Sequence, residues 1–142
     1  QYEALGEPRN MELPQARTAS YYGLGVCDRQ PGGRKTLSSY CGMFATPTLR
    51  NTATRHAFFH NGVFHSLKEV LNFYVLRDLK SAQFYPKDKN GHIKAYNDLP
   101  YQYRQNLDTT DAPFDRKPSD APALTEKERE AIIAFLGTLT DR

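Results

Sequence analysis

Residues 57–74 read AFFHNGVFHSLKEVLNFY, and the second half of this stretch carries the clearest helix signal in the chain. Ser66, with Glu69 three residues later, forms the capping-box pattern that begins a helix. Apolar or aromatic residues then recur at the spacing of a single helical face: Leu67, Val70, Leu71 and Tyr74. This spacing predicts a helix that starts after Ser66 and buries that face.

A second helix is predicted close to the end of the sequence. Thr125 and Glu128 repeat the capping-box pattern. Apolar residues follow at the same helical spacing: Ile132, Phe135, Leu136 and Leu139. We therefore expect an amphipathic helix here as well.

The segments outside these helices favour loops. Residues 1–48 are dense in glycine and proline and hold no lasting periodicity, so we expect loops with at most one short helical turn. Residues 80–124 contain many tyrosines and prolines, and the Asn-Gly pair at 90–91 indicates a tight turn within a small hairpin from Phe84 to Ala95. The predicted fold is mainly α and loop-rich, with one small β-hairpin.

Length and charge limit the classes of function. At 142 residues the chain is about one domain long. Its 19 basic and 16 acidic residues are interspersed, so no basic patch indicates nucleic-acid binding. The longest apolar run, residues 131–136, is far shorter than the ~20 residues that span a membrane. Because the sequence begins at Gln1 without a signal-peptide pattern, we expect a processed product or a segment of a longer protein.

The two cysteines, Cys27 and Cys41, have a spacing that fits no zinc knuckle. In an exported protein we expect them to form a disulfide, which would close a loop of ~15 residues and contribute ~3 kcal/mol in the chain-entropy description. The alternative is a pair of reduced thiols in a cytosolic protein.

Three histidines, His56, His60 and His65, lie close together, so a zinc site is one interpretation. His56 and His60 have the spacing of ligands on one helix, but Ala57 stands where a zinc protease carries its glutamate. Ordinary loop histidines are the default interpretation.

Several sequence words are more specific in combination. They are CGMFATPTLRN at 41–51, an FxHxG turn at 58–62, an SLxEVxxFY helix at 66–74, YNDLP at 96–100 and LTxxExxAIIAFLxTLTD at 124–141. In this order they resemble the bacterial di-haem cytochrome c peroxidase/MauG family over residues 2–141. The resemblance implies a cytochrome c-like fold. Enzymes of this family have two such haem domains, and residues 1–142 are expected to form the C-terminal portion of the second domain.

The chain departs from the family pattern in haem attachment. The family attaches each haem c through a CxxCH motif, and this sequence contains none. We therefore expect that motif and the first haem domain on an N-terminal polypeptide or segment outside this chain.

The resemblance makes Tyr74 the leading site residue. In the peroxidase branch the similar helix position supplies a methionine ligand to the high-potential haem, whereas the MauG branch has a tyrosine. A phenolate is a hard anionic donor that favours ferric and high-valent iron, and a thioether has the opposite effect. The resemblance implies that Tyr74 is an axial ligand of haem iron; without it, Tyr74 would be interpreted as a core aromatic residue.

Four other residues receive roles from the resemblance. Arg50 and His60 are expected to contact a haem propionate or the region between the haems, with a surface salt bridge and a turn contact as the respective alternatives. The backbone carbonyls of Arg55 and Ala57 match positions through which the family holds a calcium ion.

The implied activity is peroxide-dependent oxidation by an enzyme with two c-type haems. In the MauG-like form, high-valent iron oxidises a protein side chain at long range. One alternative is a cytochrome c peroxidase that reduces hydrogen peroxide with electrons from a small donor protein. Another is a haem-free binding or assembly module held by the Cys27–Cys41 disulfide. Because c-type haem attachment and disulfides both belong to the periplasm in such bacteria, we expect that location.

Overall fold

The structure is a computed structural model that describes residues 1–18, 22–25, 27 and 35–141. Its backbone contacts group the chain into two compact units. Unit 1 comprises residues 1–46 and 85–108, and unit 2 comprises residues 47–84 and 109–142. Each unit is therefore assembled from two separate stretches of sequence.

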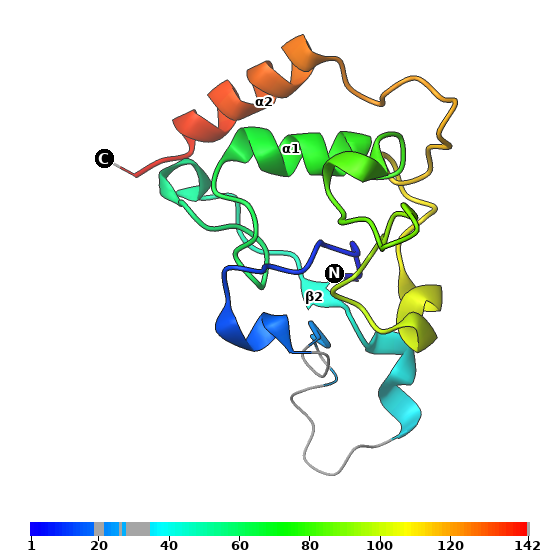
Figure 1. The fold of residues 1–142 in the computed structure, drawn as a ribbon. Coiled ribbons are helices and arrows are strands. Elements are labelled where there is room, and N and C mark those ends of the chain that lie inside the picture. Colours follow the sequence, from blue (N-terminus) through cyan, green and yellow to red (C-terminus); the bar gives the residue numbers. More distant parts are fainter. Residues whose placement is uncertain (19–21, 26, 28–34, 142) are drawn as a thin grey trace. The chain divides into compact units, whose positions relative to one another are not determined.

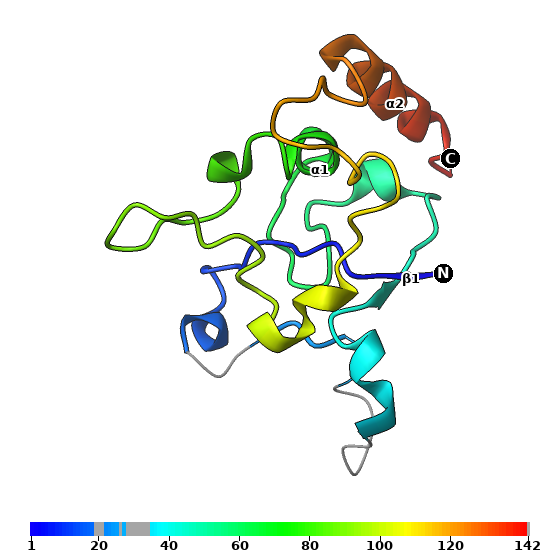
Figure 2. The ribbon, with the colours of Figure 1, turned by 90° about the vertical axis from the view of Figure 1, so that its right-hand side faces the viewer.

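Unit 1 contains a short two-stranded sheet. Strand β1 (Tyr2–Glu3) pairs antiparallel with β2 (Phe44–Ala45), and the two strands are labelled in Figures 2 and 1. The described part of the unit also holds three 3-10 helices: η1 (Pro14–Arg17), η3 (Lys35–Tyr40) and η6 (Tyr101–Asn106). The prediction of at most one helical turn in residues 1–48 is thus wrong in part, because elements this short show no periodicity in the sequence.

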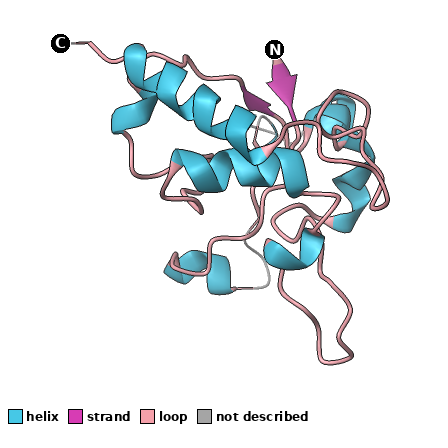
Figure 3. Cartoon of the chain, turned by 90° about the horizontal axis from the view of Figure 1, so that it is seen from above, coloured by secondary structure: helices cyan, strands magenta, loops and turns pink. Residues whose placement is uncertain are grey.

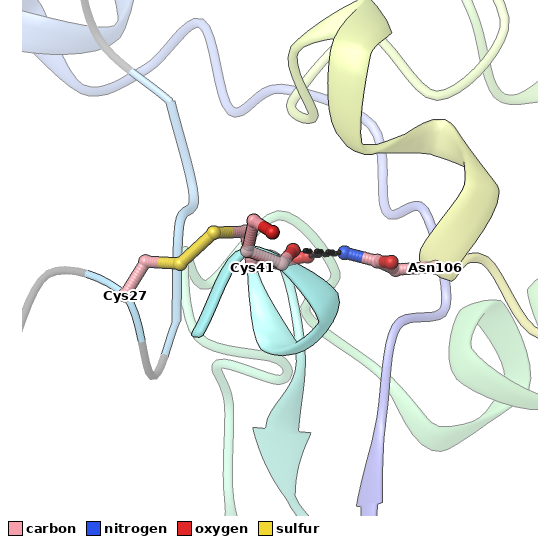
Figure 4. The surroundings of a disulfide bond; sticks show 4 residues. Cys27, Cys41 and Asn106 are labelled. Atoms are coloured by element: carbon pink, nitrogen blue, oxygen red, sulfur yellow. Dashed lines mark hydrogen bonds between the residues drawn. A yellow bond between two sulfur atoms is a disulfide. The ribbon is translucent and has the colours of Figure 1, made fainter. Parts of the chain in front are cut away.

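A disulfide between Cys27 and Cys41 cross-links the first stretch of unit 1 (Figure 4). The two Cα atoms are 5.1 Å apart. From η6, Asn106 Nδ2 donates hydrogen bonds to the carbonyl oxygens of Ser38 at 2.8 Å and Cys41 at 3.0 Å. These bonds connect the cross-linked region to the second stretch of the unit.

The hairpin predicted in residues 84–95 is present in part: the chain turns back on itself (Figure 2), but a single bridge joins its two sides and neither side forms a strand. Lys87 and Ile93 pair across it, and the N–H of Lys94 donates to the carbonyl of Pro86 at 2.8 Å. At the turn, Asp88 Oδ1 accepts from the backbone N–H of Asn90 at 2.7 Å and of His92 at 2.9 Å. These bonds, that from His92 foremost, hold the pKa of Asp88 below its usual value.

Unit 2 contains both α-helices. Helices α1 (Leu67–Leu76) and α2 (Glu126–Thr138) lie side by side (Figures 1 and 3). Two short 3-10 helices, η4 (Thr52–Thr54) and η5 (Ser81–Gln83), flank α1 in the sequence. The sequence therefore predicted both long helices, and the 3-10 turns add to them.

Both predicted capping boxes are present. At α1, the N–H of Glu69 donates to Ser66 Oγ at 3.2 Å, and the N–H of Ser66 donates to Glu69 Oε2 at 2.9 Å. At α2, Thr125 and Glu128 exchange the same two bonds, at 3.3 Å and 2.7 Å. Each box satisfies backbone donors that the first turn of a helix leaves without an intrahelical partner.

The predicted buried faces are only partly correct. On α1 the four residues of the predicted stripe are half-buried, whereas the fully buried residues are Phe73, Val75 and Leu76. On α2, Leu136 is buried, but Phe135 is 58% exposed. Periodicity locates an apolar stripe, but it does not tell whether the chain's own core or something else covers that stripe.

The core of unit 2 is predominantly aromatic. Its buried apolar residues are Phe58, Phe64, Phe73, Val75, Leu76, Phe114 and Leu136. Within the described ranges, no helix is long and apolar enough to cross a membrane.

Candidate functional site

Tyr74 lies in the last turn of α1, where its side chain is half-buried. Its ring stacks on Phe59, with centroids 5.9 Å apart and planes inclined by 25°. It also contacts Phe114, with centroids 5.3 Å apart and planes inclined by 37°. The phenol is thus held by rings from two segments distant in sequence, one before α1 and one before α2.

Phe59 has an unusual backbone conformation. Its φ of 64° lies in the left-handed region, which bulky side chains rarely adopt. In this conformation its ring also meets Phe64 and Phe73 edge-on, each at 5.5 Å. The strain is therefore accompanied by three ring contacts, one of them to Tyr74.

A buried arginine follows Tyr74 by one turn. Arg77 is 1% exposed, and its Nη2 forms an ion pair with Asp78 Oδ2 at 2.7 Å. Its guanidinium carbon lies 4.2 Å from the centroid of the Phe114 ring. No sequence pattern marked Phe59 or Phe114, because folding brings them to Tyr74 from other segments; Arg77 is a helical neighbour of Tyr74, but nothing in the sequence indicated that it would be buried.

Comparisons with known proteins place this geometry in context. No family model matches the chain. Over its whole length the chain is 28% identical to the methylamine utilization protein MauG of Paracoccus denitrificans (strain Pd 1222), of which it covers 34%. The solved di-haem peroxidase BthA from Burkholderia thailandensis E264 matches 99% of the chain with a TM-score of 0.84 and 35% identity.

The chain resembles MauG-type di-haem enzymes. A tyrosine-to-methionine variant of the same peroxidase matches equally, with a TM-score of 0.84 and 34% identity over 99% of the chain. The chain covers 33% of the peroxidase and 32% of its variant. It therefore spans about a third of the length of these relatives, and the resemblance inferred from the sequence words is confirmed.

The MauG-type resemblance assigned a role to His60, which lies exposed in the turn between Phe58 and Phe64. Within this turn Asn61 is the buried polar residue, and its Oδ1 accepts from the N–H of Val63 at 3.1 Å. The turn is thus organised in part by Asn61, a residue to which the sequence analysis gave no role.

The side chain of Arg50 interacts with the C-terminal end of the chain. Its Nη1 donates to Asp141 Oδ1 at 3.1 Å, and both side chains are mostly exposed. Asn51 reinforces this contact, because its Nδ2 donates to Asp141 Oδ2 at 2.9 Å and its Oδ1 accepts from the Asp141 N–H at 2.7 Å. Arg50 thus forms a surface salt bridge with Asp141, and its expected contact with a haem propionate stays a prediction.

Arg55 and Ala57 are exposed and lie outside helices and strands. They are the residues of this chain whose carbonyls are expected, from the family resemblance, to bind calcium. Two of the three histidines are in contact, through a ring nitrogen and a backbone carbonyl: His65 Nδ1 lies 3.0 Å from the carbonyl oxygen of His56. In the part of the chain that the structure describes, no three His, Cys, Asp or Glu side chains gather where they could hold a metal ion.

Proposed function

We propose that this chain is the C-terminal portion of the second, cytochrome c-like haem domain of a MauG-type di-haem c enzyme, in which Tyr74 is the axial ligand that this chain supplies. The observation that carries the proposal is the half-buried phenol of Tyr74, held by Phe59 and Phe114 on a helical stripe of apolar residues that unit 2 leaves half-exposed. Similarity to a di-haem peroxidase over 99% of the chain supports it.

The residues around Tyr74 fit a flat, apolar group that carries a metal. Leu67, Val70 and Leu71 form an apolar stripe with Tyr74 on α1, and their partial exposure leaves apolar area for such a group to cover. Tyr74 adds an oxygen donor at the end of this stripe, and a deprotonated phenol is a hard ligand suited to ferric iron.

In this proposal the residues of this chain bind the haem and orient the phenol of Tyr74. The stripe on α1 would pack against the porphyrin, and the rings of Phe59 and Phe114 would hold the phenol at a fixed inclination. The haem, once bound, supplies the redox chemistry by which equivalents from hydrogen peroxide are stored and passed on. A phenolate in place of a thioether would lower the reduction potential and stabilise high-valent iron, which suits storage of oxidising equivalents for a protein side chain better than service as an electron relay.

The remaining parts of the enzyme complete this proposal. The CxxCH attachment, the first haem and the peroxide-binding pocket belong to the segment outside this chain, and the enzyme works in the periplasm. The carbonyls of Arg55 and Ala57 contribute to a calcium site whose other ligands lie elsewhere. Arg50 would reach a haem propionate by exchanging its ion pair with Asp141, and His60 would hydrogen-bond to a propionate or ordered water from its exposed turn.

The test is substitution of Tyr74 in the full-length di-haem enzyme. We expect Tyr74→Phe to abolish the absorption and electron paramagnetic resonance signature of tyrosine ligation. Tyr74→Met should raise the midpoint potential of that haem, because a thioether stabilises ferrous iron relative to ferric iron. Absorption and electron paramagnetic resonance spectra of the ferric enzyme measure the first effect, and spectroelectrochemical titration measures the second.

The matched control is Tyr101→Phe, which removes the hydroxyl of a tyrosine that is 83% exposed. It should leave the spectrum and potential unchanged. A native spectrum in Tyr74→Phe would refute ligation by Tyr74. A full-length protein that purifies without haem would favour the binding-module alternative.

A further inference from the structure

Arg77 is a buried cation in the immediate surroundings of Tyr74. It caps α1 with helical backbone angles, and its N–H donates to the carbonyl of Phe73 at 2.9 Å. Because residues three apart on a helix are neighbours, Arg77 lies on the same side of α1 as Tyr74. Its side chain is fully buried, although removing a guanidinium from water is costly.

Part of that cost is offset by Asp78. Arg77 Nε lies 3.0 Å from both carboxylate oxygens of Asp78, and Nη2 lies 2.7 Å from Oδ2. Adjacent residues could form such a pair at the surface, however, so the ion pair does not explain why the guanidinium is buried. Within the buried surroundings, the guanidinium carbon also lies over the Phe114 ring, 4.2 Å from its centroid.

Phe114 links the cation to the phenol. It is 5% exposed and comes from the irregular segment before α2, where its N–H donates to the carbonyl of Asp111 at 2.7 Å. Phe114 contacts Arg77 through a cation–π stack and Tyr74 through a tilted ring contact. The Phe114 ring thus contacts both the guanidinium of Arg77 and the phenol ring of Tyr74.

We propose that Arg77 is a positioning residue, which holds Phe114 against Tyr74 and thereby fixes the orientation of the phenol for ligation. This inference rests on the proposed function of Tyr74. A planar guanidinium suits this role, because it can stack on an aromatic ring and pair with a carboxylate at the same time. A lysine would keep the charge but lose the planar stack.

The experiment uses the full-length di-haem enzyme with Arg77→Met, Arg77→Lys and Phe114→Leu. Each variant should lower the ratio of tyrosine-ligated to unligated haem, by about tenfold for Arg77→Met and Phe114→Leu and by less for Arg77→Lys. Phe114→Tyr keeps the aromatic ring, so this variant should have the same ratio of tyrosine-ligated to unligated haem as the native enzyme. Absorption and electron paramagnetic resonance spectra of the ferric enzyme measure this ratio.

The control is Arg104→Met, which removes cation–π contacts to Tyr96 at 5.9 Å and Tyr101 at 5.3 Å in unit 1. It should leave the haem spectrum native. If Arg77→Met or Phe114→Leu does not fold, Arg77→Lys decides the question. A native ratio in the folded Arg77 variants, with only a lower melting temperature, would overturn the positioning role.

The results also distinguish failure of the positioning role of Arg77 from failure of the proposed ligation by Tyr74. If Tyr74→Phe leaves the spectrum native, both are wrong. If Tyr74→Phe changes the spectrum and the Arg77 and Phe114 variants do not, Tyr74 is a ligand and the positioning role alone fails.

Discussion

Gly25 and Gly91 share a left-handed backbone but differ in their surroundings. Gly25 has a φ of 59° and Gly91 a φ of 84°. A Cβ on Gly91 would meet no atom within 4 Å, whereas a Cβ on Gly25 would collide with the backbone carbonyl of Met43. We expect Gly91→Ala to cost about 1 kcal/mol of unfolding free energy, from backbone strain alone. Gly25→Ala should cost distinctly more, because the chain must also move at Met43.

Thermal unfolding of the two variants, compared with the native protein, measures the difference. Equal losses in the two variants would show that the backbone at Met43 yields freely, and that the close approach contributes nothing to stability.

Among single residues, Tyr74 could be proposed as a site residue from the sequence, whereas the residues around it could not. Tyr74 could be singled out because it ends a helical stripe within a specific sequence word. Phe114 lies forty residues further along in a segment without periodicity, so no local pattern connects the two. Arg77 followed an apolar run as an ordinary charged residue, and charged residues are rarely buried unless paired. Both the contact of Phe114 with Tyr74 and the burial of Arg77 depend on packing between segments that are distant in the sequence.

The capping boxes allow a prediction for single elements. The backbone N–H of His65, followed by the bonds from Ser66, holds the pKa of Glu69 below its usual value. A lowered pKa in the folded state means stability that is present above the unfolded carboxyl pKa and is lost as pH falls through the folded value. Glu69→Gln should therefore be less stable than the native protein near pH 7, and the difference should shrink in acid.

Chemical denaturation between pH 7 and about pH 3 checks this expectation. The matched variant is Glu128→Gln in α2, where bonds from Thr125 likewise lower the carboxylate pKa. A difference between Glu69→Gln and the native protein that stays constant with pH would contradict the prediction.

The start of each α-helix was predictable, because the capping box is a local pattern with a local cause. Which face of α1 is buried was not. The predicted stripe from Leu67 to Tyr74 is half-exposed, and the buried residues are Phe73, Val75 and Leu76. The end of this helix, from Phe73 to Leu76, is apolar on every side, so periodicity alone does not tell which of these residues are buried. On the proposed function, the half-exposed stripe is the face that the haem covers.

For the molecule as a whole, the disulfide is the only covalent link between distant residues in the part of the chain that the structure describes. Cys27 and Cys41 are separated by 14 positions, so the bond should contribute about 3 kcal/mol by restricting the unfolded chain. The double variant Cys27→Ala/Cys41→Ala should unfold at a lower denaturant concentration than the native protein.

A reductant should lower the unfolding midpoint of the native protein towards that of the double variant and leave the variant unchanged. If reduction does not shift the native midpoint, the cross-link is without effect on stability.

The interleaving of the two units has a consequence for how genes of this kind can recombine. Residues 47–84 carry α1 and Tyr74, while residues 109–142 carry Phe114 and α2 of the same unit. A chimaera that inherited only the first of these stretches from one parent would join its Tyr74 to a Phe114 segment from the other. The intervening residues 85–108 belong to unit 1 and can come from either parent without separating that pair. An intact phenol environment is therefore inherited whenever both stretches come from the same parent, whichever parent supplies residues 85–108, whereas a single exchange within residues 85–108 separates Tyr74 from its Phe114 partner.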